Sequence, residues 1–260
     1  MQTYATLRVE ERPDAVLLVT LDRPEVANAF NTQSALDLDA VFRSVGTGPR
    51  CVVLTGAGES AFCAGADLKE RDTFSDAQWL AQHKVFERMF RAVLDCPVPV
   101  IAAVNGAAVA GGLELVLMCD FAYASKTARF ALSEVSLGLM PGGGGTQTLP
   151  RAVGERRAKE LILAARPFSA EEALAWGVVN RVCEPARLIG ETLEAASRIA
   201  ANAPLSVAQA RRAIRDGLQR DLAAGLQVEI DAYNRLVGTE DRREGIRAFN
   251  EKRKPKFQGR

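Results

Sequence analysis

The chain has 260 residues but only one histidine, His83, and it contains no GxSxG motif. A Ser-His-Asp or Cys-His mechanism would have to use this histidine, and a zinc site would need more ligands than surround it. His83 stands in the polar helical pattern AQHKVFERMF, so we interpret it as a surface or packing residue and expect no metal site. Carboxylates are then the leading candidates for acid–base chemistry.

Cysteines are few, lie far apart and include no CxxC pair, at Cys51, Cys63, Cys96, Cys119 and Cys183. This spacing predicts free, mostly buried thiols in a reducing compartment. No apolar run reaches the roughly 18 residues of a membrane-spanning helix, and the N-terminal sequence MQTYATLRVEERPD lacks the apolar segment of a secretory signal. The net charge of +1 argues against a surface built for nucleic acid or anionic membrane. We therefore expect a cytoplasmic protein that binds neither.

Strand and helix patterns alternate through the first half of the chain. Apolar runs predict strands at 15–21, 51–55, 100–104 and 121–124, and residues 6–10 alternate. Helical patterns lie between them at 32–45 (capped by Asn31), 76–94 and 113–118. From about residue 146 the pattern is helical, at 155–165, 169–176, 185–202, 204–217 and 220–236, with 178–182 as an exception. The alternation predicts an α/β core followed by a helical region that packs on the core or on a neighbouring subunit.

Small residues fill the segment Cys63-Ala64-Gly65-Ala66-Asp67-Leu68-Lys69. Such residues let a ligand approach the backbone closely and can leave N–H groups uncommitted. The alternative interpretation is a tight turn packed under a helix.

A second motif joins Asn105-Gly106 to the run from Ala108 to Met118, in which Gly111 and Gly112 precede Glu114. N–H groups at a helix start lack intrahelical partners and lie at the positive end of the helix dipole, which suits an oxyanion. Glu114 lies in the first turn of an otherwise apolar helix. A lone carboxylate there is costly unless it has a purpose or partners, and the alternative is a capping glutamate.

A third motif surrounds Glu134, another acid among apolar neighbours, and continues into the glycines at 142–145. Four glycines in a row permit unusual backbone angles before a new helix begins. By itself Glu134 is equally compatible with a residue on a surface strand.

Together, in this order and spacing, the motifs resemble the crotonase or enoyl-CoA hydratase/isomerase family. The resemblance begins at Leu21-Asp22-Arg23-Pro24 and continues through CAGADLKE, AVNGAAVAGGLELVLMCD and SEVSLGLMPGGGGTQTLPR. It ends at 248–254, so it covers nearly the whole chain. It implies an α/β crotonase-like spiral of repeated ββα units over 1–195. It also implies a C-terminal helical region, 196–260, that builds a homotrimer or a dimer of trimers and covers the active site.

The resemblance also implies roles for individual residues. It implies that Ala66 and Gly111 donate the oxyanion-hole N–H groups, and that Glu114 and Glu134 are the catalytic acids of a hydratase. Contacts to the acyl-CoA substrate are implied for Ala27, Ala64, Asp67, Leu68, Lys69, Phe249 and Lys252. Coenzyme A is then part of the substrate, and no separate cofactor is expected.

Three alternatives stay open within this resemblance. The chain also resembles the methylglutaconyl-CoA hydratase subgroup, through CAGADLKER, PGGGGTQ and EKRKPKF, and isomerases occur in the same family. A non-catalytic or RNA-binding homologue is the third alternative. The helix at 32–45 carries no lysine and only Arg43 as a cation, which opposes RNA binding there.

The C-terminal run Lys252-Arg253-Lys254-Pro255-Lys256 holds three of the seven lysines of the chain. A solvated tail is the ordinary interpretation of such a run. However, Phe249 and Phe257 flank it, and the phosphates of coenzyme A require cations. With the resemblance, this predicts that Lys252 binds a phosphate of coenzyme A and that Phe249 packs near the acyl chain.

Overall fold

The structure is a computed structural model that describes residues 3–46 and 48–260. Within these residues, the larger of two sheets has the spatial order β1-β2-β3-β5-β7-β10. Its strands are Leu7–Glu11, Val16–Leu21, Cys51–Gly56, Val100–Val104, Phe121–Ser125 and Arg181–Cys183. Neighbours are parallel except β1 and β2. Every residue of β2, β3 and β5 is buried, as expected for parallel strands covered on both faces.

The smaller sheet has the order β4-β6-β8-β9, in the strands Ala61–Cys63, Ala107–Val109, Arg129–Ala131 and Phe168–Ser169. β4 follows β3, β6 follows β5 and β8 follows β7, so each turn of the chain places one strand in each sheet. This arrangement is the expected spiral of ββα units, and the expected α/β fold class is confirmed.

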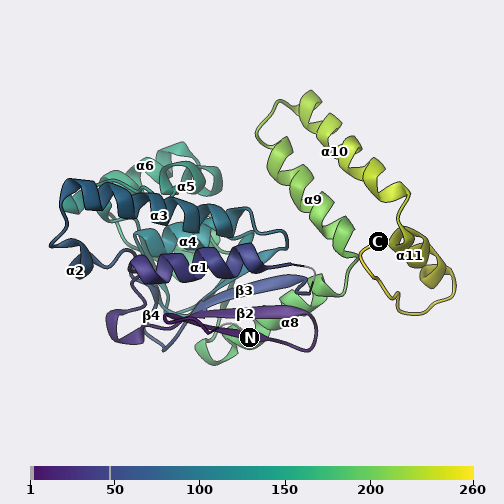
Figure 1. Ribbon diagram of the computed structural model, residues 1–260. Coiled ribbons are helices and arrows are strands. Elements are labelled where there is room, and N and C mark those ends of the chain that lie inside the picture. The colour runs from purple at the N-terminus through teal and green to yellow at the C-terminus, as the bar shows by residue number, and fades with distance from the viewer. Residues whose placement is uncertain (1–2, 47) are drawn as a thin grey trace.

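Helices cover both faces of the larger sheet (Figure 1). α8, Leu188–Ala200, packs on β2, β3, β5 and β7, where its Leu188 and Ala196 meet one set of alternating strand residues that includes Val53 and Ile101. The other set joins the main core, under α1, Thr32–Ser44, and α3, Asp76–Leu94. The expected cap of α1 is confirmed, because the Asn31 side chain accepts a hydrogen bond from Ser34 N at 2.9 Å.

Most of the remaining helices connect the strands of the two sheets. Short ones are η1, Pro24–Val26, α2, Leu68–Arg71, η2, Glu134–Leu137, α7, Ala170–Ala175, and η3, Pro185–Arg187. Longer ones are α4, Gly111–Met118, α5, Gly145–Val153, and α6, Glu155–Leu163. The predicted helical segments are present with slightly different ends, and the exception at 178–182 overlaps the start of β10.

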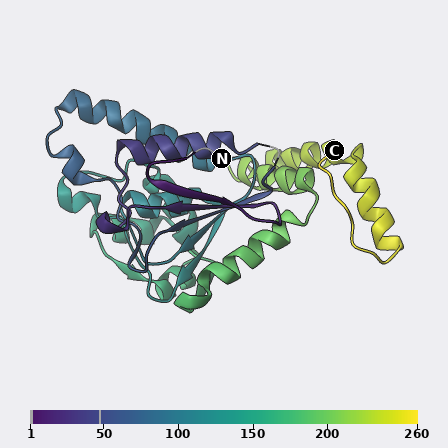
Figure 2. The ribbon, with the colours of Figure 1, turned by 60° about the horizontal axis from the view of Figure 1, so that its bottom comes forward.

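Three helices leave the core as an arm, which both views show at the right of the molecule (Figures 1 and 2). They are α9, Pro204–Gly217, α10, Leu222–Val237, and α11, Glu240–Asn250. Arg211 fastens α9 to the core by ion pairing with Asp120 and by donating to the Leu94 carbonyl at 3.1 Å. The expected domain boundary at residue 195 falls inside α8, which packs on the sheet, and the arm begins at α9.

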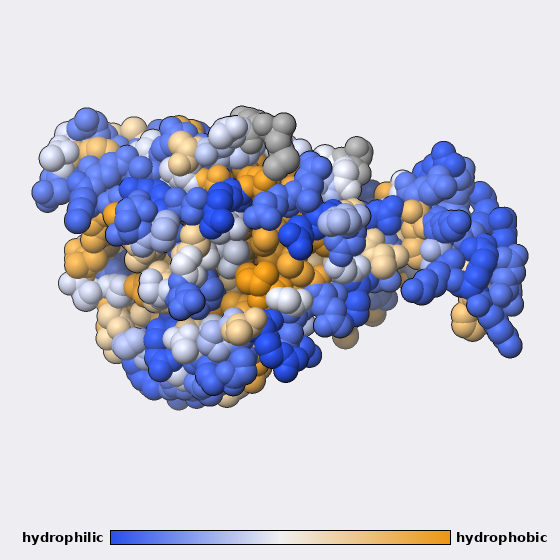
Figure 3. Space-filling view, turned by 90° about the horizontal axis from the view of Figure 1, so that it is seen from below, coloured by the Kyte–Doolittle hydropathy of each residue, from blue (hydrophilic) through white to orange (hydrophobic). Residues whose placement is uncertain are grey.

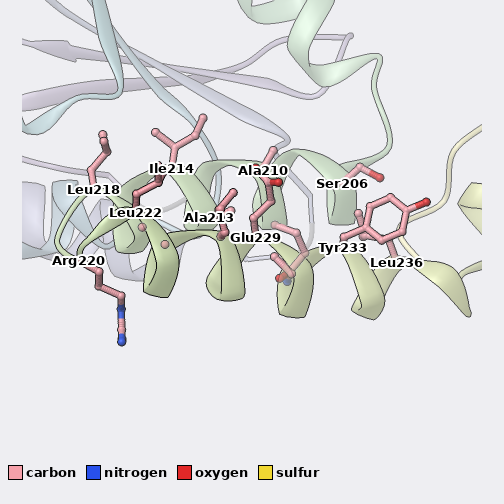
Figure 4. A pocket seen from close by; sticks show the side chains of 15 residues that line it. Ser206, Ala210, Ala213, Ile214, Leu218, Arg220, Leu222, Glu229, Tyr233 and Leu236 are labelled. Atoms are coloured by element: carbon pink, nitrogen blue, oxygen red, sulfur yellow. The ribbon is translucent and has the colours of Figure 1, made fainter.

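α9 and α10 form a hairpin with an apolar groove of about 720 Å³ between them (Figure 4). Its large apolar side chains are exposed: Ile214, Leu218, Leu222, Leu226 and Tyr233. The arm therefore carries an apolar surface that a single chain leaves uncovered, although other faces of it are hydrophilic (Figure 3).

The predicted free thiols are confirmed for all five cysteines. Burial raises the pKa of Cys51 and Cys63 to about 12 and that of Cys96 and Cys183 to about 11. These thiols stay protonated at neutral pH and are poor nucleophiles. Among the described residues, no helix combines the length and apolar character needed to cross a membrane.

Candidate active site

The loop after β4 leaves one backbone N–H group uncommitted, that of Ala66. Phe30 N donates to Gly65 O at 2.8 Å, and Asp67 N donates to Phe30 O at 2.9 Å. This parallel bridge uses the residues on either side of Ala66. Among the described residues, the N–H group of Ala66 therefore has no backbone acceptor.

A second uncommitted N–H group lies beside it at the start of α4. Gly111 is the first residue of this helix, so its N–H group has no intrahelical partner. The preceding Ala110 has φ 51° and ψ −125°, an unusual conformation for a residue with a side chain, which turns the chain sharply into the helix. A Cβ atom placed on Gly65 would lie 3.1 Å from Gly111 N, so the two loops are in contact.

Close packing explains why glycines start α4. A Cβ atom on Gly111 would lie 2.5 Å from Phe30 Cζ, and one on Gly112 would lie 2.0 Å from Cys63 O. Both distances are shorter than van der Waals contact, so a side chain at Gly111 would push the helix away from Phe30, and one at Gly112 would push it away from the end of β4. The glycines thus set the separation between the two N–H groups.

Glu114 lies on the buried side of α4 and is 3% exposed. Its Oε1 accepts hydrogen bonds from Gly143 N and Gly145 N, each at 2.8 Å. The carboxyl group therefore fixes the glycine segment and does not cap its own helix. Burial above all, together with the nearby charge of Glu134, raises the pKa of Glu114 to about 7, although the two backbone hydrogen bonds lower it.

Glu134 is the first residue of η2, so it does not lie on a strand. In the part of the chain that the structure describes, its Oε2 atom is buried and has no hydrogen-bond partner. Burial raises the pKa of Glu134. Burial thus disfavours ionisation of both carboxyl groups, and a charge on Glu134 opposes ionisation of Glu114.

One cavity of about 880 Å³ joins these groups. Residues of the first motif, of α3 and of the segment after η2 form its walls, which are mostly apolar: Phe30, Leu68, Trp79, Leu80, Phe86, Phe90, Leu137, Leu139 and Met140. The exposed side chains of Leu80, Leu137 and Met140 lie at its opening to solvent. The cavity can therefore hold an apolar chain whose reactive end lies at the two glutamates.

Most of the residues that the sequence analysis proposed come together in this cavity. They are Ala64, Ala66, Leu68, Gly111, Glu114 and Glu134. Ala27 lies behind them, since its carbonyl accepts from Ala64 N at 3.0 Å. Asp67 forms an ion pair with Arg23 at 3.1 Å and accepts from Lys69 N, and the Lys69 side chain is exposed.

Phe249 and Lys252 lie elsewhere in the single chain, at the end of α11 and just after it. Neither is among the residues that line the cavity. Phe249 is 82% exposed, and Lys252 has φ 53° where the chain turns away from the helix. Arg253 pairs with Glu244 at 2.6 Å, and Gln258 N donates to Asp241, so the tail is fastened back onto α11.

Several cavity residues were outside the candidates from the sequence, above all Arg71, Trp79, His83 and Phe90. His83 is half-buried and packs on the glycine segment, because a Cβ atom on Gly142 would lie 2.8 Å from its Cε1. The helical periodicity of 76–94 was the available signal, but it marks a packed face without telling what packs against it. Among the described residues, no cluster of histidine, cysteine, aspartate and glutamate has the composition of a metal site.

Two adjacent backbone donors and a pair of carboxyl groups in an apolar cavity, on a spiral of ββα units, define an enzyme fold suited to thioester chemistry. A sequence model of the enoyl-CoA hydratase/isomerase family matches residues 11–260. The chain belongs to this family, and the resemblance seen in its motifs is confirmed.

Individual relatives agree with this assignment. The chain is 40% identical to the short-chain-enoyl-CoA hydratase of Clostridium acetobutylicum, over 94% of each chain. It is 35% identical to the human mitochondrial methylglutaconyl-CoA hydratase, over 100% of this chain and 79% of that one. A solved structure of an enoyl-CoA hydratase from Bacillus anthracis superposes with a TM-score of 0.96 at 42% identity, covering 98% of this chain and 100% of that one.

Proposed function

We propose that this chain catalyses the addition of water to the double bond of a 2-enoyl-CoA thioester. The observation that carries the proposal is the convergence of Glu114, Glu134 and the N–H groups of Ala66 and Gly111 on one apolar-walled cavity. Family membership supports it, as do the relatives that carry hydratase names. The retained pair of glutamates favours hydration over the non-catalytic alternative.

The oxyanion donors act on the thioester. When the hydroxyl group of water bonds to the β-carbon, the double-bond electrons move toward the carbonyl and negative charge builds on the thioester oxygen. The N–H groups of Ala66 and Gly111 stabilise this charge, aided by the dipole of α4. One such donor is worth roughly 100- to 1000-fold in rate.

The two glutamates manage the protons of the water molecule. We assign Glu114 as the base that accepts a proton from water and Glu134 as the acid that delivers a proton to the α-carbon. The reaction then needs one proton on the pair, a state that the raised pKa values of both groups support near neutral pH. The unpartnered Oε2 of Glu134 is available to bind the water or the reacting carbon.

The test replaces each glutamate by glutamine and follows hydration of crotonyl-CoA by the loss of its conjugated double bond. Each variant should lose at least about 100-fold in kcat, since general acid–base groups contribute 10²- to 10⁴-fold. Near-normal rates in either variant would contradict the two-carboxyl mechanism. Isomerisation without hydration by the unmodified protein would favour the isomerase alternative.

We also propose that the arm builds a homotrimer or a dimer of trimers. Exposed Leu218, Leu222 and Tyr233 on the α9–α10 hairpin support this, because burying such side chains is favourable (Figure 4). In that assembly, Phe249 and Lys252 could reach the cavity of a neighbouring subunit. Sedimentation equilibrium tests the state directly, and a monomer at micromolar concentration would refute it.

The cytoplasm is the compartment that we propose for the reaction. Five unpaired thiols, four of them buried, support a reducing environment.

A further inference from the structure

Arg71 is a buried cation that the hydration mechanism does not use. It is the last residue of α2, it is 8% exposed, and it lines the same cavity as Glu114 and Glu134. Within the described residues, the single hydrogen bond of its side chain runs from Nε to Gln82 Oε1 at 2.6 Å, and its Nη2 is buried without a partner. A guanidinium group has five N–H donors, so most of its hydrogen-bonding capacity is unused.

Two aromatic rings and an amide hold the guanidinium in place. Its central carbon lies 4.1 Å from the centroid of the Trp79 ring and 4.8 Å from that of Phe86. Gln82, which accepts from Arg71, donates in turn to Thr32 Oγ1 at 2.7 Å and to Glu70 Oε2 at 2.6 Å. The position of the charge is therefore set before any ligand arrives.

Glu70 is the acidic neighbour of this group, yet it leaves Arg71 free toward the cavity. Its carboxylate accepts from Thr32 N at 3.0 Å and from Gln82, and it is not among the residues that line the cavity. Arg71, by contrast, is a cavity wall residue. A ligand inside the cavity therefore meets a permanent positive charge in a mostly apolar wall.

An unsubstituted hydrocarbon chain would leave this buried charge unpaired, which is unfavourable. A carboxylate would match the planar fork of the guanidinium. It would be repelled close to Glu114 and Glu134, so it must lie where Arg71 compensates its charge. We propose that the acyl group of the preferred substrate carries a carboxylate of its own, and that Arg71 binds it. This inference rests on the proposed hydratase function and names its substrate class.

The test uses two substrates with the same heavy-atom skeleton, glutaconyl-CoA and 5-methylhex-2-enoyl-CoA. They differ in whether the acyl chain ends in a carboxylate or in an isopropyl group. We expect the unmodified protein to have the higher kcat/KM for glutaconyl-CoA. Arg71→Met should lower the ratio of the two kcat/KM values by about 10- to 100-fold, as expected for a hydrogen bond to a charged group. Arg71→Lys should restore part of the ratio, because the charge returns without the fork.

Controls separate the possible failures. Arg157, which stacks over Trp176 at 4.3 Å outside the cavity, is the matched control, and Arg157→Met should leave the ratio unchanged. Retained activity of Arg71→Met on the neutral substrate shows that the variant is folded. Equal or better hydration of the neutral substrate by the unmodified protein overturns the inference but not the hydratase function. An unchanged ratio in Arg71→Met overturns it as well. Hydration of crotonyl-CoA but of neither of these substrates overturns the inference alone, and hydration of none of the three overturns the hydratase function as well.

Discussion

Replacing Glu114 by glutamine should make the protein more stable at alkaline pH while removing its activity. The Glu114 side chain is 3% exposed, and burial raises its pKa to about 7 from an ordinary value of 4.5. Below about pH 4.5 the carboxyl group is protonated in the folded and the unfolded chain alike, so it carries no penalty. Between about pH 4.5 and 7 the unfolded chain releases this proton while the folded chain still holds it, so stability falls over this range. Above about pH 7 both states are ionised, and the full penalty remains.

The size of this loss follows from the pKa. A tenfold change in proton affinity corresponds to about 1.4 kcal/mol, so a rise from 4.5 to about 7 makes the ionised group about 3 kcal/mol less favourable in the folded chain. Glutamine keeps the acceptor oxygen that Gly143 N and Gly145 N require. The stability difference between Glu114→Gln and the unmodified protein should therefore grow from near zero at about pH 4 to about 3 kcal/mol at about pH 7.5 and stay constant above that.

Urea unfolding of both proteins at equal concentration, across this pH range, measures the difference. The matched control is Glu59→Gln, since Glu59 lies exposed in the turn between β3 and β4 and its replacement should change stability little. A constant difference for Glu114→Gln over the whole range would refute the reasoning, because it would mean that Glu114 ionises as easily in the folded chain as in the unfolded one.

Three further predictions concern the pH profile, the glycine segment and the arm. The plot of kcat/KM against pH should be bell-shaped, with the alkaline limb starting near pH 7, because the coupled pair of glutamates loses its last proton there. Activity that keeps rising beyond about pH 9 would contradict one shared proton. Gly143→Ala should destabilise the protein by about 1–3 kcal/mol in thermal unfolding and lower kcat, because the added Cβ would lie 2.2 Å from Phe90 Cε2. Gly190→Ala, which meets no atom within 4 Å, is its control. Lys252→Ala should raise KM at low salt with little change in kcat, because losing an exposed charge contact weakens binding by on the order of 1 kcal/mol. An unchanged KM would argue against a phosphate contact.

The longer strands could be predicted from the sequence, whereas the short ones could not. β2, β3 and β5 are continuous apolar runs, and a run of that kind predicts a strand covered on both faces. β4, β6 and β8 have three residues each, too few to show a period of two. They form because the neighbouring turns of the spiral hold them side by side, and a single segment carries no sign of that. α11 was not predicted either, because charged residues dominate it and it buries only Asp241 and Ala248.

The two glutamates of the site also differed in how clearly the sequence marked them. Glu114 stands alone in the apolar sequence GGLELVLM, and this local contrast already predicts a buried carboxylate with partners. Its actual partners, Gly143 N and Gly145 N, lie about thirty residues further along, where the four glycines gave no hint of which N–H groups would be used. Of the two glutamates, Glu134 gave the weaker sequence signal, because it begins a short 3-10 helix whose burial depends on the whole cavity.

The wall that α3 contributes shows why periodicity alone could not reveal the substrate. Trp79, His83, Phe86 and Phe90 follow one another at spacings of four, three and four residues, the spacing of one helix face. A face that packs on protein and a face that packs on a ligand have the same period and the same apolar composition. The two kinds of helix face differ only in what packs against them. Here the glycine segment comes so close to α3 that Gly142 and Gly143 have no room for side chains beside His83 and Phe90, while the rest of the face borders the cavity. The glycines thus let the segment that binds the Glu114 carboxyl group approach α3 at His83 and Phe90. Trp79, nearer the start of α3, is left facing the cavity with the Arg71 side chain of α2 stacked on it.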